Sequence, residues 1–128
     1  MARLIVADAS VLIAHLDGAD AFHQRATARL EEAAGQRLAA SPITLAEVLV
    51  GPVRVGQAAE AQAALRTLEI EEVPLGPGAP SRLAVLRATT NLKLPDCCVL
   101  LAAEDATGTV LSFDERLVAV AATLGLAG

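Results

Sequence analysis

The sequence predicts an α/β fold of three layers, in which a central parallel sheet of four to five short strands lies between layers of helices. Two observations predict this fold. Short runs of aliphatic residues alternate along the chain with longer, alanine-rich segments that have a helical period. Strands that are separated by helices favour parallel pairing, because a parallel crossover needs a connection about as long as a helix.

Length and composition predict one aliphatic domain that spans residues 1–128. A chain of 128 residues can bury a single core, and no repeat or low-complexity tract divides it. Hydrophobic residues make up 54% of the chain, yet Phe22 and Phe113 are its only aromatic residues. The run from Cys97 to Ala103 is too short to cross a bilayer, and the N-terminus lacks the pattern of a signal peptide. We therefore expect a soluble cytoplasmic protein without a membrane partner.

The N-terminal elements follow from local pattern. The residues from Arg3 to Asp8 are short, apolar and β-branched, which predicts a central strand, and Ser10 is the expected cap of the helix after it. An amphipathic pattern predicts a helix over residues 20–34, which a glycine ends before a second strand at residues 37–40.

The remaining elements are read in the same way. Ser41 and Pro42 begin a helix that Gly51 and Pro52 are expected to break. The pattern then predicts a helix over 57–68, a strand-like segment over 70–75, helices over 80–90 and 94–107, a strand over 109–113 and a helix over 115–124.

Four acidic residues, Asp8, Glu47, Asp96 and Asp114, each follow an apolar run and open a helical pattern. In a parallel sheet such positions meet at one edge, so we expect the four side chains to share a pocket. Taken singly, each has an ordinary role: Asp114 as a helix cap, Asp96 in a first helical turn, and Glu47 in a capping box with Thr44.

Together the four acids indicate a site for a divalent metal ion. Two carboxylates about 4 Å apart repel by roughly 4 kcal/mol at an effective dielectric constant near 20, so a cluster of four requires a cation. Mg2+ or Mn2+ fits oxygen ligands and leaves coordination positions for a substrate phosphate. The histidines His15 and His23 do not form a zinc motif, and the chain has neither a GxSxG nor a phosphate-binding loop.

The net charge of −5 is unusual for a protein that binds nucleic acid, because phosphate contacts normally need a basic surface. The distribution of charge matters more than its sum. If several acids gather around a metal ion, the remaining cations are free to line a groove beside them. These cations are Arg25, Arg29, Arg54, Arg82, Arg87 and Lys93, which could equally be the solvated faces of helices.

Over nearly its whole length the chain resembles the PIN-domain nucleases, and in particular the VapC toxins of toxin-antitoxin modules. LIVADASVLIA resembles the opening strand of the family, SPITLAEVL its glutamate-bearing helix, and LPDCCVLLAAEDATGTVLSFDERL its aspartate helix and following strand. The resemblance implies that Asp8, Glu47, Asp96 and Asp114 hold Mg2+ or Mn2+, with Ser10 and Ser112 in support. It also implies cleavage of RNA, a homodimer, and a small antitoxin protein as partner.

The chain departs from the family pattern at a few positions. Ser112 stands where a threonine is usual, Leu117 stands where an aromatic residue is usual, and the chain ends soon after the last helix, which puts a final edge strand in doubt. Two other functions remain open. One is a PIN-like module that binds RNA or protein without turnover, and the other is phosphoryl transfer through Asp8 as a nucleophile.

Overall fold

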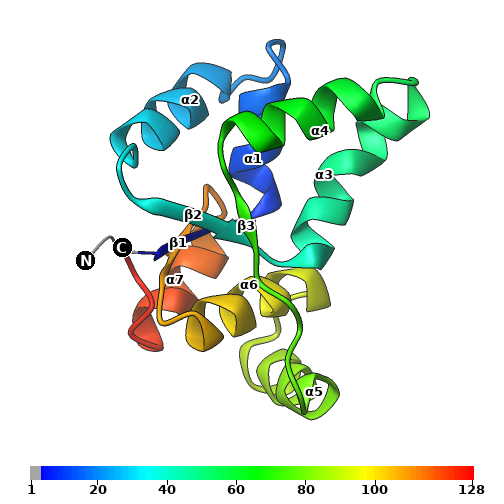
Figure 1. The fold of residues 1–128 in the computed structure, drawn as a ribbon. Coiled ribbons are helices and arrows are strands. Elements are labelled where there is room, and N and C mark those ends of the chain that lie inside the picture. The colour runs from blue at the N-terminus through cyan, green and yellow to red at the C-terminus, as the bar shows by residue number, and fades with distance from the viewer. Residues whose placement is uncertain (1–3) are drawn as a thin grey trace.

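The computed structural model describes residues 4–128, and its centre is a parallel sheet of four strands in the order β3-β2-β1-β4 (Figure 1). This confirms the predicted fold class. The strands are β1 (Leu4–Ala7), β2 (Arg37–Ala40), β3 (Glu71–Glu72) and β4 (Thr109–Leu111). The predicted first strand began at Arg3, which lies outside the described residues.

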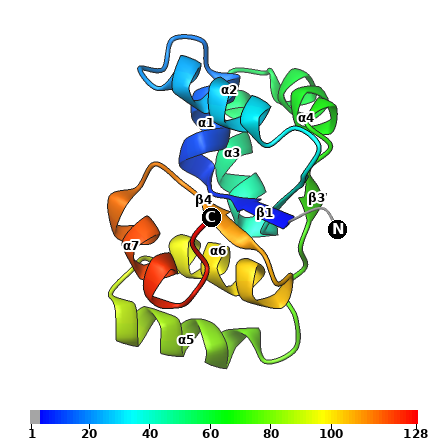
Figure 2. The same cartoon turned by 90° about the vertical axis from the view of Figure 1, so that its left-hand side faces the viewer.

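Helices cover both faces of the sheet and complete the three layers. Figures 1 and 2 show α1 to α4 on one face and α5 to α7 on the other. Their bounds are α1 (Ala9–Leu16), α2 (His23–Glu32), α3 (Pro42–Arg54), α4 (Ala58–Thr67), α5 (Ala79–Thr90), α6 (Leu94–Asp105) and α7 (Glu115–Thr123). Within residues 4–128, every helix is too short or too polar to cross a membrane.

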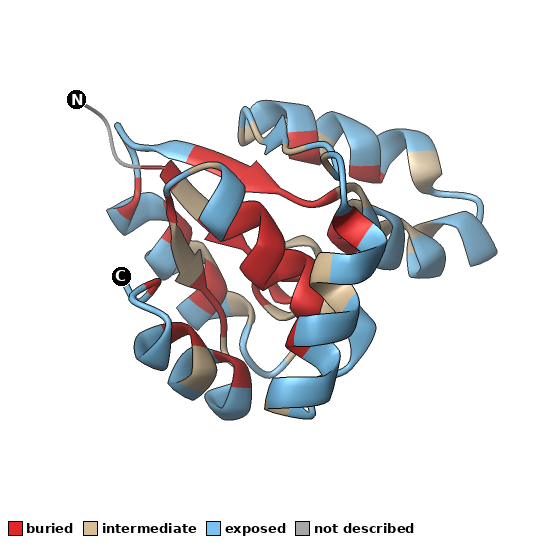
Figure 3. Cartoon of the chain, turned by 90° about the horizontal axis from the view of Figure 1, so that it is seen from below, coloured by how far each residue is buried: buried red, intermediate tan, exposed pale blue. Residues whose placement is uncertain are grey.

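The alternation of side chains along β1 divides the core between the two faces. Leu4 and Val6 pack into a cluster with residues of α5, α6 and α7. Ile5 and Ala7 face the other way, into the two clusters built from α1 to α4. Because β1 is central and covered on both faces, packing from both sides fixes the position of its C-terminal end. Figure 3 shows the buried residues concentrated in the middle of the molecule.

The first helix is capped by a different residue from the one predicted. Asp8, not Ser10, is the N-cap of α1, and its side chain accepts a hydrogen bond from the backbone N–H of Val11. The predicted capping box at Glu47 is also wrong, because Ser41 is the N-cap of α3 and Thr44 lies inside the helix. In both cases the residue expected to cap the helix lies later in the chain than the observed cap: Ser10 instead of Asp8, and Thr44 instead of Ser41.

Helix α3 passes through the predicted break at Gly51 and Pro52 and continues to Arg54. A proline in the last turn removes one backbone hydrogen bond, which the rest of the helix tolerates. The chain turns instead at Gly56, which has a φ of 71° and is followed by a hydrogen bond from the N–H of Gln57 to the carbonyl of Pro52.

The doubtful edge strand at the C-terminus is reduced to one parallel bridge. Ala127 pairs with Val110, and the backbone N–H of Val110 donates to the carbonyl of Leu126 at 2.8 Å. The end of the chain therefore lies along β4 without extending into a full fifth strand.

Candidate metal centre

Asp8 is the most buried of the four predicted acids. It follows the central strand β1, and only 5% of its surface is exposed. Three donors orient its carboxylate: Ser10 Oγ reaches Oδ1 at 2.6 Å, the N–H of Val11 reaches Oδ1 at 3.3 Å, and Ser112 Oγ reaches Oδ2. A buried carboxylate needs hydrogen-bond partners of this kind, because burial removes its contact with water.

The two supporting serines also join the end of β4 to Asp8. The backbone N–H of Asp114 donates to Ser112 Oγ at 2.9 Å, and the N–H of Phe113 donates to Ser10 Oγ at 3.2 Å. Each hydroxyl therefore accepts a hydrogen bond from the segment that follows β4 and donates one to Asp8. This network fixes the positions of Asp8 and Asp114 relative to each other, as expected for the carboxyl ends of neighbouring parallel strands.

Asp114 is exposed and serves as the N-cap of α7, which was its ordinary interpretation. Its Oδ1 accepts from the N–H groups of Arg116 at 2.9 Å and Leu117 at 3.1 Å. Its other carboxylate oxygen, Oδ2, makes no hydrogen bond to any residue in the range 4–128. A capping role therefore leaves one oxygen of Asp114 available to a ligand.

Glu47 and Asp96 come from helices on opposite faces of the sheet. The charge of each nevertheless interacts with the charges of other acids at the site. Partial burial, then the charges of Asp96 and Asp8, raise the pKa of Glu47. Partial burial, then the charges of Asp114 and Asp8, raise the pKa of Asp96, and Lys93 and Arg116 offset part of this effect. The first turn of α6 and the middle of α3 thus bring their acids to the edge of the sheet where β1 and β4 end.

Charge interactions link Glu47 with Asp8 and Asp96, and link Asp96 with Asp8 and Asp114, but the carboxylates do not close on one point. Within the described residues, no three acidic, histidine or cysteine side chains lie close enough to share a metal ion directly. An Mg2+ ion keeps several water ligands and needs only one or two carboxylates in its inner shell, so this looser set of oxygens fits it chemically. Thr44 lies one turn before Glu47, and among residues 4–128 its fully buried hydroxyl finds no hydrogen-bond partner.

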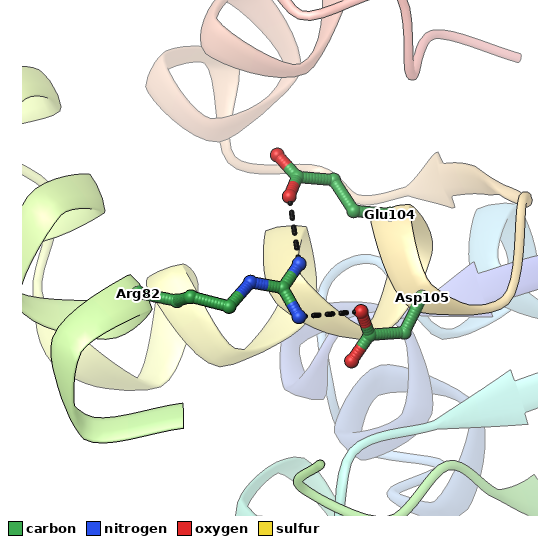
Figure 4. Close-up of polar contacts among 3 residues, drawn as sticks. All are labelled: Arg82, Glu104 and Asp105. Atoms are coloured by element: carbon green, nitrogen blue, oxygen red, sulfur yellow. Dashed lines mark hydrogen bonds and ion pairs between the residues drawn. The ribbon is translucent and has the colours of Figure 1, made fainter. Parts of the chain in front are cut away.

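Two further acids on α6 lie outside the centre. Arg82 on α5 donates to Asp105 at 2.6 Å and to Glu104 at 3.1 Å, as Figure 4 shows. Because a helix rises about 1.5 Å per residue, Asp105 lies about 13 Å along α6 from Asp96. These contacts connect α5 to the last turn of α6. Arg82 was predicted as one of the cations that could line a groove, but its guanidinium is paired with these two acids.

The sequence analysis missed two groups that bear on the site. Arg116 was not among the predicted cations, although it lies two residues after Asp114 and lowers the pKa of Asp96. Its position in the first turn of α7 was the available signal. The unpaired hydroxyl of Thr44 had no signal in the sequence, because only packing reveals that it is buried.

Comparison with known proteins identifies the family. A model of the PIN domain matches residues 5–123. A structure of a toxin-antitoxin complex from Klebsiella pneumoniae is 28% identical, covers 84% of each chain and gives a TM-score of 0.71. No curated protein matches the sequence.

Two more distant structures share the fold. The sarcin-ricin loop cleaving toxin VapC20 from Mycobacterium tuberculosis is 17% identical over 91% of this chain and 94% of that one, with a TM-score of 0.76. VapBC2 from Rickettsia felis, bound to a DNA fragment from its promoter, is 14% identical over 85% and 86%, with a TM-score of 0.62. The family match covers almost the whole chain, and the chain belongs to the PIN-domain family.

Proposed function

We propose that this protein is a VapC-type toxin, a metal-dependent endoribonuclease that hydrolyses RNA phosphodiester bonds. The observation that carries the proposal is the meeting of acids from separate segments: Ser112 joins Asp8 to the backbone of Asp114, and repulsion from neighbouring acids adds to burial in raising the pKa of Glu47 and of Asp96. Such repulsion is costly unless a cation compensates it. Membership of the PIN-domain family and likeness to VapC structures support the same function.

Asp8, Glu47, Asp96 and Asp114 would hold Mg2+ or Mn2+. When bound, such an ion activates water for attack on phosphorus and neutralises the leaving oxygen. The Asp8 carboxylate is oriented by Ser10 and Ser112. Glu47 and Asp96 would help to hold the ion and to position the water that it activates.

Three biological features belong to the same proposal. We propose that the protein acts in the cytoplasm, forms a homodimer and is neutralised by a small cognate antitoxin. Support for the antitoxin comes from the relatives, since the structure from Klebsiella pneumoniae is a toxin-antitoxin complex and that from Rickettsia felis is VapBC2.

The test compares Asp96→Asn with Asp105→Asn, the same change at the two ends of α6. Replacing a metal-holding carboxylate should reduce Mg2+-dependent cleavage of total RNA by at least about 100-fold. Asp105→Asn should cleave at the wild-type rate, because Asp105 contacts only Arg82 among the described side chains. Circular dichroism checks that both variants are folded. Undiminished cleavage by Asp96→Asn would reject the site.

A binding module without turnover is separated from the enzyme by the effect of metal on stability. An ion that binds only the folded protein stabilises it by about 2.7 kcal/mol at 100 times its Kd. We expect Mn2+ to raise the Tm of the wild type and of Asp105→Asn, but to raise that of Asp96→Asn much less. A Tm that ignores Mn2+ in all three proteins would favour the inert module.

Phosphoryl transfer through Asp8 fits the site less well than hydrolysis. A nucleophilic aspartate must offer a free oxygen to phosphorus. Both oxygens of Asp8 already accept hydrogen bonds, and its side chain is almost fully buried. Attack by Asp8 is therefore the less favoured alternative.

A further inference from the structure

The only two aromatic residues of the chain meet on the surface, and an arginine lies over them. The rings of Phe22 and Phe113 have centroids 5.7 Å apart and planes tilted by 35°. The guanidinium carbon of Arg25 lies 4.7 Å from the centroid of Phe113 and 6.0 Å from that of Phe22. We call Phe22, Arg25 and Phe113 the aromatic platform.

The platform adjoins the candidate metal centre. Phe113 stands in the chain between Ser112 and Asp114, and its backbone N–H donates to Ser10 Oγ, which in turn donates to Asp8. Its ring packs at the edge of the core cluster of α1 and α2. Phe113 therefore anchors the platform, while Phe22 is 50% exposed and Arg25 is exposed on α2.

Local structure does not account for the exposed members. Phe22 occupies the N-cap of α2, where its side chain makes no capping hydrogen bond, although serine, threonine and aspartate are the residues that stabilise this position. Arg25 makes no ion pair with any acid in residues 4–128, in contrast to Arg29, which pairs with Glu32. A half-exposed ring and an unpaired guanidinium remain open to a ligand.

We propose that the aromatic platform stacks an unpaired base of single-stranded RNA beside the cleavage centre, with Arg25 contacting an adjacent phosphate. Every nucleobase has a face that can stack on an aromatic ring or on a guanidinium plane. A duplex is disfavoured, because its bases are already stacked on each other. The assignment rests on the proposed function and defines its substrate as an unpaired segment, such as a loop.

The aromatic platform also explains how a protein with a negative net charge could bind RNA. With a total of −5, the surface as a whole repels RNA, so binding needs contacts that do not depend on overall charge. Base stacking is largely insensitive to salt, whereas one arginine contact to a phosphate contributes about one unit to the slope of log affinity against log salt. Loss of the Phe22 ring should therefore weaken RNA binding with little change in its salt dependence, whereas loss of the Arg25 charge should change the salt dependence.

The experiment measures binding of a single-stranded RNA oligonucleotide in EDTA, where cleavage cannot occur, using 2-aminopurine as a fluorescent base at successive positions. The wild type should quench one or two adjacent positions. Phe22→Leu keeps an apolar side chain but loses the aromatic face, and it should bind about tenfold more weakly without quenching. Phe22→Trp should retain both the binding affinity and the quenching. Arg25→Gln should lower the salt slope by about one, which the matched change Arg66→Gln on α4 should not do.

The outcomes separate the platform from the proposed function. If wild type and Phe22→Leu bind equally, quench equally and cleave equally in Mg2+, the platform is rejected and the nuclease remains. If stacking and its loss are observed but no divalent ion supports cleavage, the platform stands and the nuclease function fails. A wild type that binds no RNA in EDTA, or quenches no position, overturns the platform.

Discussion

The hydroxyl of Ser112 should stabilise the folded protein far more than an ordinary surface serine, and Ser112→Ala tests this. The hydroxyl is 8% exposed, donates to Asp8 and accepts from the N–H of Asp114. A hydrogen bond to a buried charge contributes about 1.5–3 kcal/mol, and water cannot readily replace it at an aspartate that is 5% exposed. The N–H of Asp114 lies at the surface and loses less. We expect Ser112→Ala to lower the free energy of unfolding by about 2–3 kcal/mol.

Urea denaturation in EDTA, followed by circular dichroism, measures this change without a contribution from metal. With an m value of about 2 kcal/mol/M, the midpoint should fall by about 1 M or more. Ser81→Ala is the matched control, because Ser81 is exposed on α5 and the same substitution there should shift the free energy by less than about 0.5 kcal/mol. If both variants unfold at the same midpoint, the hydroxyl does not hold the carboxylate of Asp8 and the orienting network is wrong.

Two further predictions concern pH and backbone packing. The raised pKa of Asp96 means that the folded protein binds a proton there more tightly than the unfolded chain does. In EDTA, its contribution to stability is thus full below the ordinary aspartate pKa and is lost as pH rises through the raised value. Asp96→Asn should flatten this part of the fall in unfolding free energy between about pH 4 and 7, and urea titrations with an unchanged slope would contradict it. Gly108→Ala should destabilise the fold by about 1–3 kcal/mol, because a Cβ at this position would lie 2.7 Å from the carbonyl oxygen of Leu4. Gly18→Ala, which meets nothing within 4 Å and has no positive φ, is the control and should shift the free energy of unfolding by less than about 0.5 kcal/mol in the same urea assay.

The fold was predictable because its signals are local and strong. The β-branched run before Asp8 and the amphipathic periods after it define strands and helices without reference to the rest of the chain. Errors occurred where two local signals compete. At Asp8 and Ser10 both side chains can cap a helix, and burial at the end of β1 decides for Asp8. At Pro52 the breaker lies so near the helix end that the helix passes through it.

The sequence predicts where the candidate site lies, and the assignment of its residues stays a prediction. Asp8, Glu47, Asp96 and Asp114 could be placed at one edge because parallel strands align their ends. Sequence could not show that the carboxylates stop short of a shared coordination point, since that depends on side-chain rotamers and on helix packing. It also missed the meeting of Phe22 with Phe113, because the pair joins α2 to the end of β4 across 91 positions of sequence, a long-range contact without a local signal.

The order of strands in the sheet has a consequence for synthesis of the protein. The central strand β1 is made first, but its neighbour β4, which leads to Ser112 and Asp114, is made almost last. In a nascent chain whose β4 is still inside the ribosome, Asp8 lacks the hydrogen bond from Ser112. Strand β1 then also lacks its neighbour on one side. Translation products that end before β4 therefore lack Asp114 and cannot bring together the whole set of four acids.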